Sequence, residues 1–279
     1  MNYNNEAYTE MIETIFQDLS IEQLSTSAKL MNIRKYTEIV VRRILKLPNE
    51  QSVMLGNIDI IQELKTRGYY THHFFKANYD LLRSKGNANS HTQIRRENGQ
   101  PGSNATDEVN EALNALMNLY SFMFYKFFKD YSFKNTQIIR AFSILPPIIR
   151  YNCLKLLHED SPRDTLIIEK YILAMIKSFD NEFATNWIYQ NQELLESIPL
   201  YDEQSLQVLS NISPFIASAF SSKTIFDKAL ELVSLPFPPL YKNLKEAKQL
   251  YLQNGILHEK TEECMEFNDL MEFVYIGRD

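Results

Sequence analysis

The sequence predicts an all-α protein with two helical units. Apolar residues recur at three- and four-residue spacings along the whole chain, and the alternation typical of a strand is sustained nowhere. Only 7 of the 279 residues are glycine, which argues against the tight hairpins of an all-β fold and against a glycine-rich phosphate loop. Eight of the ten prolines follow residue 145, which indicates a second all-helical unit of stacked helices.

Five helices are expected in the first unit, where apolar residues line one face of each segment. They are 7–19, 27–46, 57–66, 71–84 and 107–130. We expect Pro48 to end the second helix and Gly86 to interrupt the fourth, because both residues disfavour a continuing helix. The polar segment 96–106 is expected to be a loop. The aromatic residues of the last helix are expected in the core.

The second unit is expected to be an irregular array of helices between prolines. The expected helices are 147–158, 163–179, 182–196, 203–220, 223–233 and 240–254. No fixed period is convincing, so a repeat-like stack stays open as an alternative. With a boundary between 131 and 146, the expected units are 1–135, a helical bundle, and 136–279, a helical C-terminal domain.

Composition excludes several classes of protein. The two cysteines, Cys153 and Cys264, lack partners at zinc-ligand spacing, so no metal and no cofactor is expected. The N-terminal residues lack the basic and apolar parts of a secretory signal. No stretch reaches the roughly 18 apolar residues of a membrane span. A cytoplasmic protein without a membrane partner is expected.

Charge is distributed unevenly along the chain. The formal net charge is −6, yet residues 31–96 carry twelve Lys and Arg against five acids. Residues 136–279 carry thirteen against twenty. A basic segment in an acidic protein attracts polyanions, although solvated helix faces explain the same count.

One string combines residue types suited to phosphate chemistry. It is LLRSKGNANSH, residues 81–91, which contains Arg83, Gly86, Asn87 and His91. We expect Gly86 to break the helix, Asn87 to cap the next one or to hold a phosphate or a ring nitrogen, and Arg83 and His91 to converge at the junction.

This string resembles the Arg-x-x-Gly-Asn-x-x-x-His signature of a domain-of-unknown-function family within the HEPN superfamily of helical domains. Upstream, the segment 32–45 resembles the first core helix of that family, with Arg34 and then Glu38 four residues later. The resemblance covers about residues 25–130 and implies a HEPN-like helical bundle that dimerises. It implies Arg83, His91 and Asn87 as the catalytic site, supported by Glu38 and Arg34.

Many members of the superfamily are metal-independent endoribonucleases of prokaryotic antiviral defence or toxin systems. RNA supplies its own nucleophile, the 2′-hydroxyl, so a histidine that moves a proton and an arginine that stabilises charge suffice for cleavage. A homodimer would supply both an acid and a base. The seven residues between Arg83 and His91 exceed the usual spacing of the superfamily's motif, which puts catalysis in question.

Two classes of function therefore stay open. The first is a metal-independent endoribonuclease with RNA as its substrate. The second is a non-catalytic module that binds RNA or a partner protein, the latter through the acidic C-terminal domain. A further string, RGYYTH from Arg67 to His72, meets the superfamily's usual spacing and is interpreted as a chance match.

Overall fold

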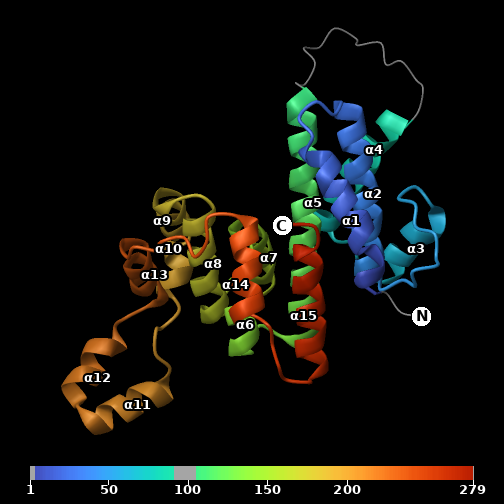
Figure 1. Ribbon diagram of the computed structural model, residues 1–279. Helices are drawn as coiled ribbons and strands as arrows, with labels where there is room; N and C mark the ends of the chain where they lie inside the picture. The colour runs from blue at the N-terminus through green and yellow to red at the C-terminus, as the bar shows by residue number, and fades with distance from the viewer. Residues whose placement is uncertain (1–3, 91–104, 279) are drawn as a thin grey trace. The chain divides into compact units, whose positions relative to one another are not determined.

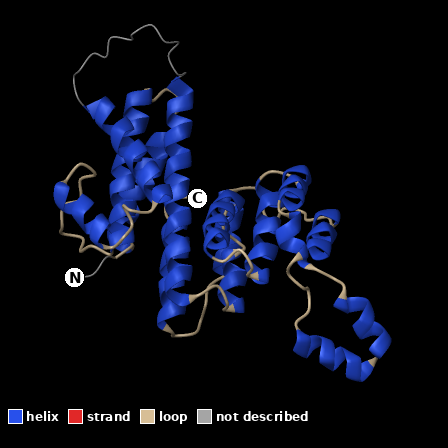
Figure 2. Ribbon diagram, turned by 180° about the vertical axis from the view of Figure 1, so that it is seen from behind, coloured by secondary structure: helices blue, strands red, loops and turns tan. Residues whose placement is uncertain are grey.

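The computed structural model describes residues 4–90 and 105–278, and the fold is all-α, as the sequence predicts. Figure 2 shows helices joined by loops, with no strand in the described part. None of the described helices combines the length and the apolar character needed to cross a bilayer.

Two compact units divide the chain. The first contains the residues up to Ile144 together with those from Asn243 onward, and the second is Leu145–Lys242. This differs from the expected units 1–135 and 136–279, because the last two helices group with the N-terminal bundle. The acidic C-terminal half predicted as one domain is therefore shared between the two units.

The first unit is built around three long helices. Its elements are the 3₁₀ turn Glu6–Tyr8 and helices α1 (Thr9–Ser20), α2 (Thr26–Leu45), α3 (Ile58–Thr66), α4 (His73–Ser90), α5 (Ala105–Tyr131), α6 (Thr136–Phe142), α14 (Leu244–Asn254) and α15 (Glu262–Tyr275). Helices α2, α4 and α5 pack against one another, α1 packs on α2, and α15 on α5 (Figure 1). The expected bundle of the second, fourth and fifth helices is thus confirmed.

Aromatic side chains fill this bundle. The expectation that the aromatic run of α5 lies in the core is confirmed, because Tyr120, Phe122 and Phe124 are at most 1% exposed. From α4, Phe75 packs on Phe122 with ring centroids 4.9 Å apart. Such pairs contribute about 0.5–1.5 kcal/mol beyond the burial of their area.

The expected break at Gly86 is wrong, since α4 continues to Ser90. A Cβ on Gly86 would lie 2.6 Å from Cδ and 2.9 Å from Cβ of Arg34 on α2. The glycine therefore allows two helices to approach closely instead of ending one of them. Asn87 consequently lies inside α4 and caps no following helix.

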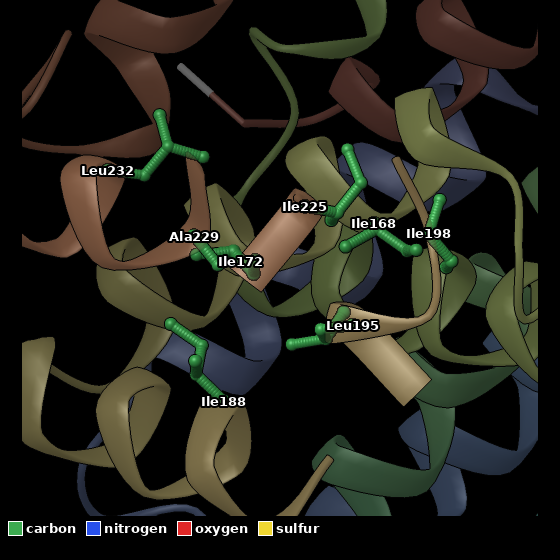
Figure 3. Packing of buried hydrophobic residues seen from close by; sticks show 8 residues of the cluster. All are labelled: Ile168, Ile172, Ile188, Leu195, Ile198, Ile225, Ala229 and Leu232. Carbon is green, nitrogen blue, oxygen red and sulfur yellow. The ribbon is translucent and has the colours of Figure 1, made fainter. Parts of the chain in front are cut away.

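The second unit packs shorter helices around one apolar cluster. Its helices are α7 (Pro147–Asp160), α8 (Thr165–Ser178), α9 (Asn181–Gln190), α10 (Gln192–Glu196), α11 (Glu203–Ile212), α12 (Pro214–Ser221) and α13 (Ile225–Ser234). Figure 3 shows the cluster, in which Ile168 and Ile172 of α8 meet Ala229 and Leu232 of α13.

The helices α11 and α12 form a hairpin that is closed at its base. Pro199 and Thr224 form an antiparallel bridge there, and Leu200 N–H donates to the Lys223 carbonyl at 2.9 Å. Pro214 divides the single helix expected over 203–220 into two. Helix α11 buries none of its side chains.

Candidate functional site

Helices α2 and α4 carry the predicted site residues that the structure describes. Gly86 allows α4 to pack closely against the aliphatic part of the Arg34 side chain on α2. Arg34 Nε lies 3.5 Å from Glu38 Oε1, one turn further along α2. The structure therefore brings Arg34, Glu38 and the last turns of α4 together.

Glu38 is held by groups from two segments. Burial raises the pKa of its carboxyl, and the charge of Arg34 and a hydrogen bond from Leu55 N–H act in the opposite direction. The carboxyl is thus half-buried and oriented by two donors. It also lines a groove of about 780 Å³ between α1, α2 and the loop near Asn49 and Val53, so solvent reaches it.

Tyr79 of α4 also contacts the loop between α2 and α3, at Leu55. Its hydroxyl donates to the Leu55 carbonyl at 2.6 Å. Burial raises the pKa of Tyr79, and the charge of Arg83 lowers it. Leu55 thus accepts from Tyr79 through its carbonyl and donates to Glu38 through its N–H, which links α4 to the carboxyl on α2.

Arg83 forms an ion pair within its own helix. Its Nη2 lies 3.2 Å from Asp80 Oδ1. Asp80 also accepts from Lys76 Nζ and from the Tyr70 hydroxyl, each at 2.8 Å. Burial opposes ionisation of Asp80, but these two hydrogen bonds and the charge of Arg83 outweigh it and lower its pKa. An ionised Asp80 thus holds Arg83 at the surface, where the arginine side chain is 31% exposed.

Two predicted residues cannot be placed in this geometry. His91 lies outside the described residues, so the expected approach of His91 to Arg83 stays a prediction. For Asn87 the structure describes only the backbone, within α4.

The second string runs from Arg67 at the surface to His72 against the bundle. Arg67 Nε lies 2.7 Å from Glu63 Oε1. The His72 ring packs against Phe122 and Tyr125 with centroids 5.2 and 5.4 Å away. The ring contacts give His72 a structural role, while Arg67 pairs at the surface, and the interpretation of the string as a chance match stays a prediction.

Acids from elsewhere in the chain neutralise part of the basic segment 31–96. Glu266 of α15 lies 3.2 Å from Arg43 and 3.0 Å from Lys46. Glu111 of α5 lies 2.8 Å from Lys85. The net charge counted along the sequence therefore overstates the positive field of the bundle.

Helix α15 is not among the helices expected from the sequence, and its ion pairs with α2 are not part of the predicted site. A local signal for this helix exists, because the Thr261 hydroxyl accepts from Cys264 N–H as an N-cap. Apolar residues then follow at helical spacing, namely Phe267, Leu270, Met271 and Val274. The pairing of Glu266 with α2 has no such signal, because the partners are more than two hundred residues apart.

Family models, curated proteins and solved structures were all compared with this chain, and none of them matches it.

Proposed function

We propose that the first unit is a HEPN-like module that acts on RNA, and that Arg83 and His91 cleave the strand without a metal ion. The observation that carries the proposal is the contact of Gly86 with Arg34. It puts the Arg34–Glu38 pair of α2 beside the turns of α4 that bear Arg83. Two guanidinium groups from neighbouring helices suit a phosphate that is contacted from two sides.

The chemistry needs only groups that RNA and this chain supply. The 2′-oxygen attacks the adjacent phosphorus, the 2′-O–P bond forms and the P–O5′ bond breaks. His91 removes the 2′-hydroxyl proton, and a second histidine from another copy protonates the leaving 5′-oxygen. Arg83 stabilises the charge on the phosphoryl oxygens in the transition state. The products are a 2′,3′-cyclic phosphate and a 5′-hydroxyl.

The test is cleavage of an end-labelled RNA pool by the full chain in the presence of a chelator. We expect His91→Ala to abolish cleavage and Arg83→Ala to slow it by about 10²–10³-fold, as for loss of an oxyanion donor. His258→Ala, at an exposed position, is the matched control and should cleave like the wild type. RNA with 2′-deoxy linkages should resist cleavage. Equal decay with wild type and His91→Ala would exclude this site.

A bacterial growth assay tests the proposed role as a defence or toxin effector. Expression of the wild type should arrest growth, while His91→Ala at the same protein level should not. Growth arrest by both proteins would separate toxicity from the site.

A second candidate function is non-catalytic binding of RNA or of a partner protein. The observation that favours it is that the described cations of the site already have acidic partners, with Arg83 on Asp80 and Arg34 on Glu38. A module of this kind would bind RNA weakly, lose affinity steeply as salt rises, and leave the strand intact.

A further inference from the structure

A cavity in the second unit has a positively charged and apolar lining. Its volume is about 200 Å³, and it lies among α7, α8 and the segment that follows α13. Arg150 of α7 and Lys177 of α8 are its charged residues, and Phe237, Pro239 and Leu240 form much of its apolar wall. No carboxylate is among the residues that line it.

Two residues that line the cavity donate hydrogen bonds to the same backbone carbonyl. Arg150, which is 6% exposed, donates from Nε to the Leu145 carbonyl at 2.9 Å. The Tyr241 hydroxyl donates to the same carbonyl at 2.8 Å. These two bonds fix the arginine and anchor the segment Phe237–Tyr241 against the start of α7, so the cavity is preformed.

Lys177 is placed where an anion would be favourable. Burial lowers the pKa of its ammonium group, and the charge of Arg150 lowers it further. Within the described part of the chain, no acid contributes to this shift. An anion between the two cations would relieve their repulsion and replace water lost by burial.

We propose that this cavity binds a small organic anion, with a carboxylate or phosphate at Lys177 and Arg150 and an apolar body of about one ring against Phe237 and Leu240. The volume limits the size, because pockets for drug-sized ligands span about 300–1,000 Å³. The inference is independent of the proposed action on RNA, since every residue involved lies in the second unit.

Paired ligands of one shape test the role of charge. Titration calorimetry on the full chain would compare benzoate with benzamide, its neutral counterpart, and with phenyl phosphate. We expect saturable binding of benzoate or phenyl phosphate, the tighter of the two identifying the head group, and at least about tenfold weaker binding of benzamide. Inorganic phosphate alone should bind more weakly than phenyl phosphate, because it lacks the apolar body.

Variants of Lys177 then locate the site. Lys177→Met should weaken binding of the preferred anion by about tenfold or more, and Lys177→Arg should retain it. The matched control is Lys170→Met on the same helix, where the lysine pairs with Glu169 at 3.1 Å outside the cavity. Equal affinity for benzoate and benzamide, unchanged affinity in Lys177→Met, or no saturable binding of either anion at about 10 mM would overturn the proposal.

Discussion

The guanidinium charge of Arg278 acts on the hydroxyl of Tyr36 in the interior of the first unit. The same group lies over the rings of Phe16 and Tyr120, 5.0 and 5.6 Å from their centroids. Burial raises the pKa of Tyr36 to about 12, even though Arg278 acts in the opposite direction. One side chain near the C-terminus therefore connects α1, α2 and α5.

Arg278→Ala should destabilise the first unit. The variant loses the two cation–π contacts with Phe16 and Tyr120, and we expect a cost of about 1–3 kcal/mol in the free energy of unfolding. Urea denaturation followed by circular dichroism measures it. Arg140→Ala, at an exposed position of α6, is the control and should stay within about 0.5 kcal/mol of wild type. Equal stability of the two variants would contradict a structural role for Arg278.

Gly86→Ala should destabilise the protein, although alanine in a helix is ordinarily about 1 kcal/mol better than glycine. The added Cβ would collide with the side chain of Arg34 and push α4 away from α2. Thermal unfolding measures the change. Combining it with Arg34→Ala should recover part of the loss, because the Cγ and Cδ that obstruct the new methyl are removed.

Gly56→Ala is the matched control for that substitution. A Cβ on Gly56 would meet no atom within 4 Å, so this variant should be as stable as the wild type or slightly more stable. If Gly86→Ala behaved like Gly56→Ala, close approach of the two helices would not be the reason for glycine at 86.

Asp80→Asn should strengthen RNA binding by the first unit. The change removes the carboxylate that holds Arg83 and Lys76, so both cations become available to phosphate. We expect the slope of log K against log salt to steepen by about 0.7 for each added contact. Arg83→Ala should change affinity and slope in the opposite direction. Glu63→Gln, which frees Arg67 away from this site, is the control, and an equal gain there would indicate a general charge effect.

The second unit should lose stability as the pH falls below about 6.5. Burial lowers the pKa of His158, so the unfolded chain takes up a proton before the folded protein does. The contribution of the neutral His158 to the free energy of unfolding is complete above the pKa of the unfolded chain. It is lost progressively as the pH falls below that value, by up to about 1.4 kcal/mol per pH unit. Trp187, the single tryptophan, lies 5.4 Å from the His158 ring and reports unfolding of this unit by fluorescence.

His158→Phe isolates this effect. Phenylalanine keeps the ring packing on Tyr171 and Trp187 and cannot titrate. Nδ1 of His158 makes no hydrogen bond within the described residues, so its loss leaves no partner unsatisfied. The stability difference between pH 7.5 and 5.5 should shrink in the variant, and an unchanged difference would assign the titration to another group.

Cleavage through one histidine per chain requires two copies at the site. Light scattering at micromolar concentration should give twice the mass of the single chain, and mixing inactive His91→Ala chains into wild type should lower the activity per wild-type chain. A monomer that still cleaves RNA would rule out a composite site and leave the binding role intact.

Local patterns predict the helices of this protein well. The helix expected over 27–46 is α2, Thr26–Leu45, because Ser25 caps its start and apolar residues repeat along one face. The close pairs Arg34–Glu38 and Asp80–Arg83 also follow from spacing along a helix.

Features that depend on distant segments could not be predicted in this way. Gly86 has the sequence signature of a helix end, and only its contact with Arg34, far back in the chain, explains a continuous α4. Likewise, Glu266 neutralises Arg43 only because α15 folds back onto the first unit. Charge counted in a sequence window misses this kind of pairing.

The bridge between Pro199 and Thr224 makes the α11–α12 hairpin a removable module. Because its two ends are joined by the backbone bonds around this bridge, the intervening segment can be shortened to a turn or replaced by another sequence with little change in the distance that the chain must close. The apolar cluster below, with Ile198 and Ile225 on either side, would keep its packing. A fluorescent tag inserted in this hairpin should therefore leave the rest of the second unit folded.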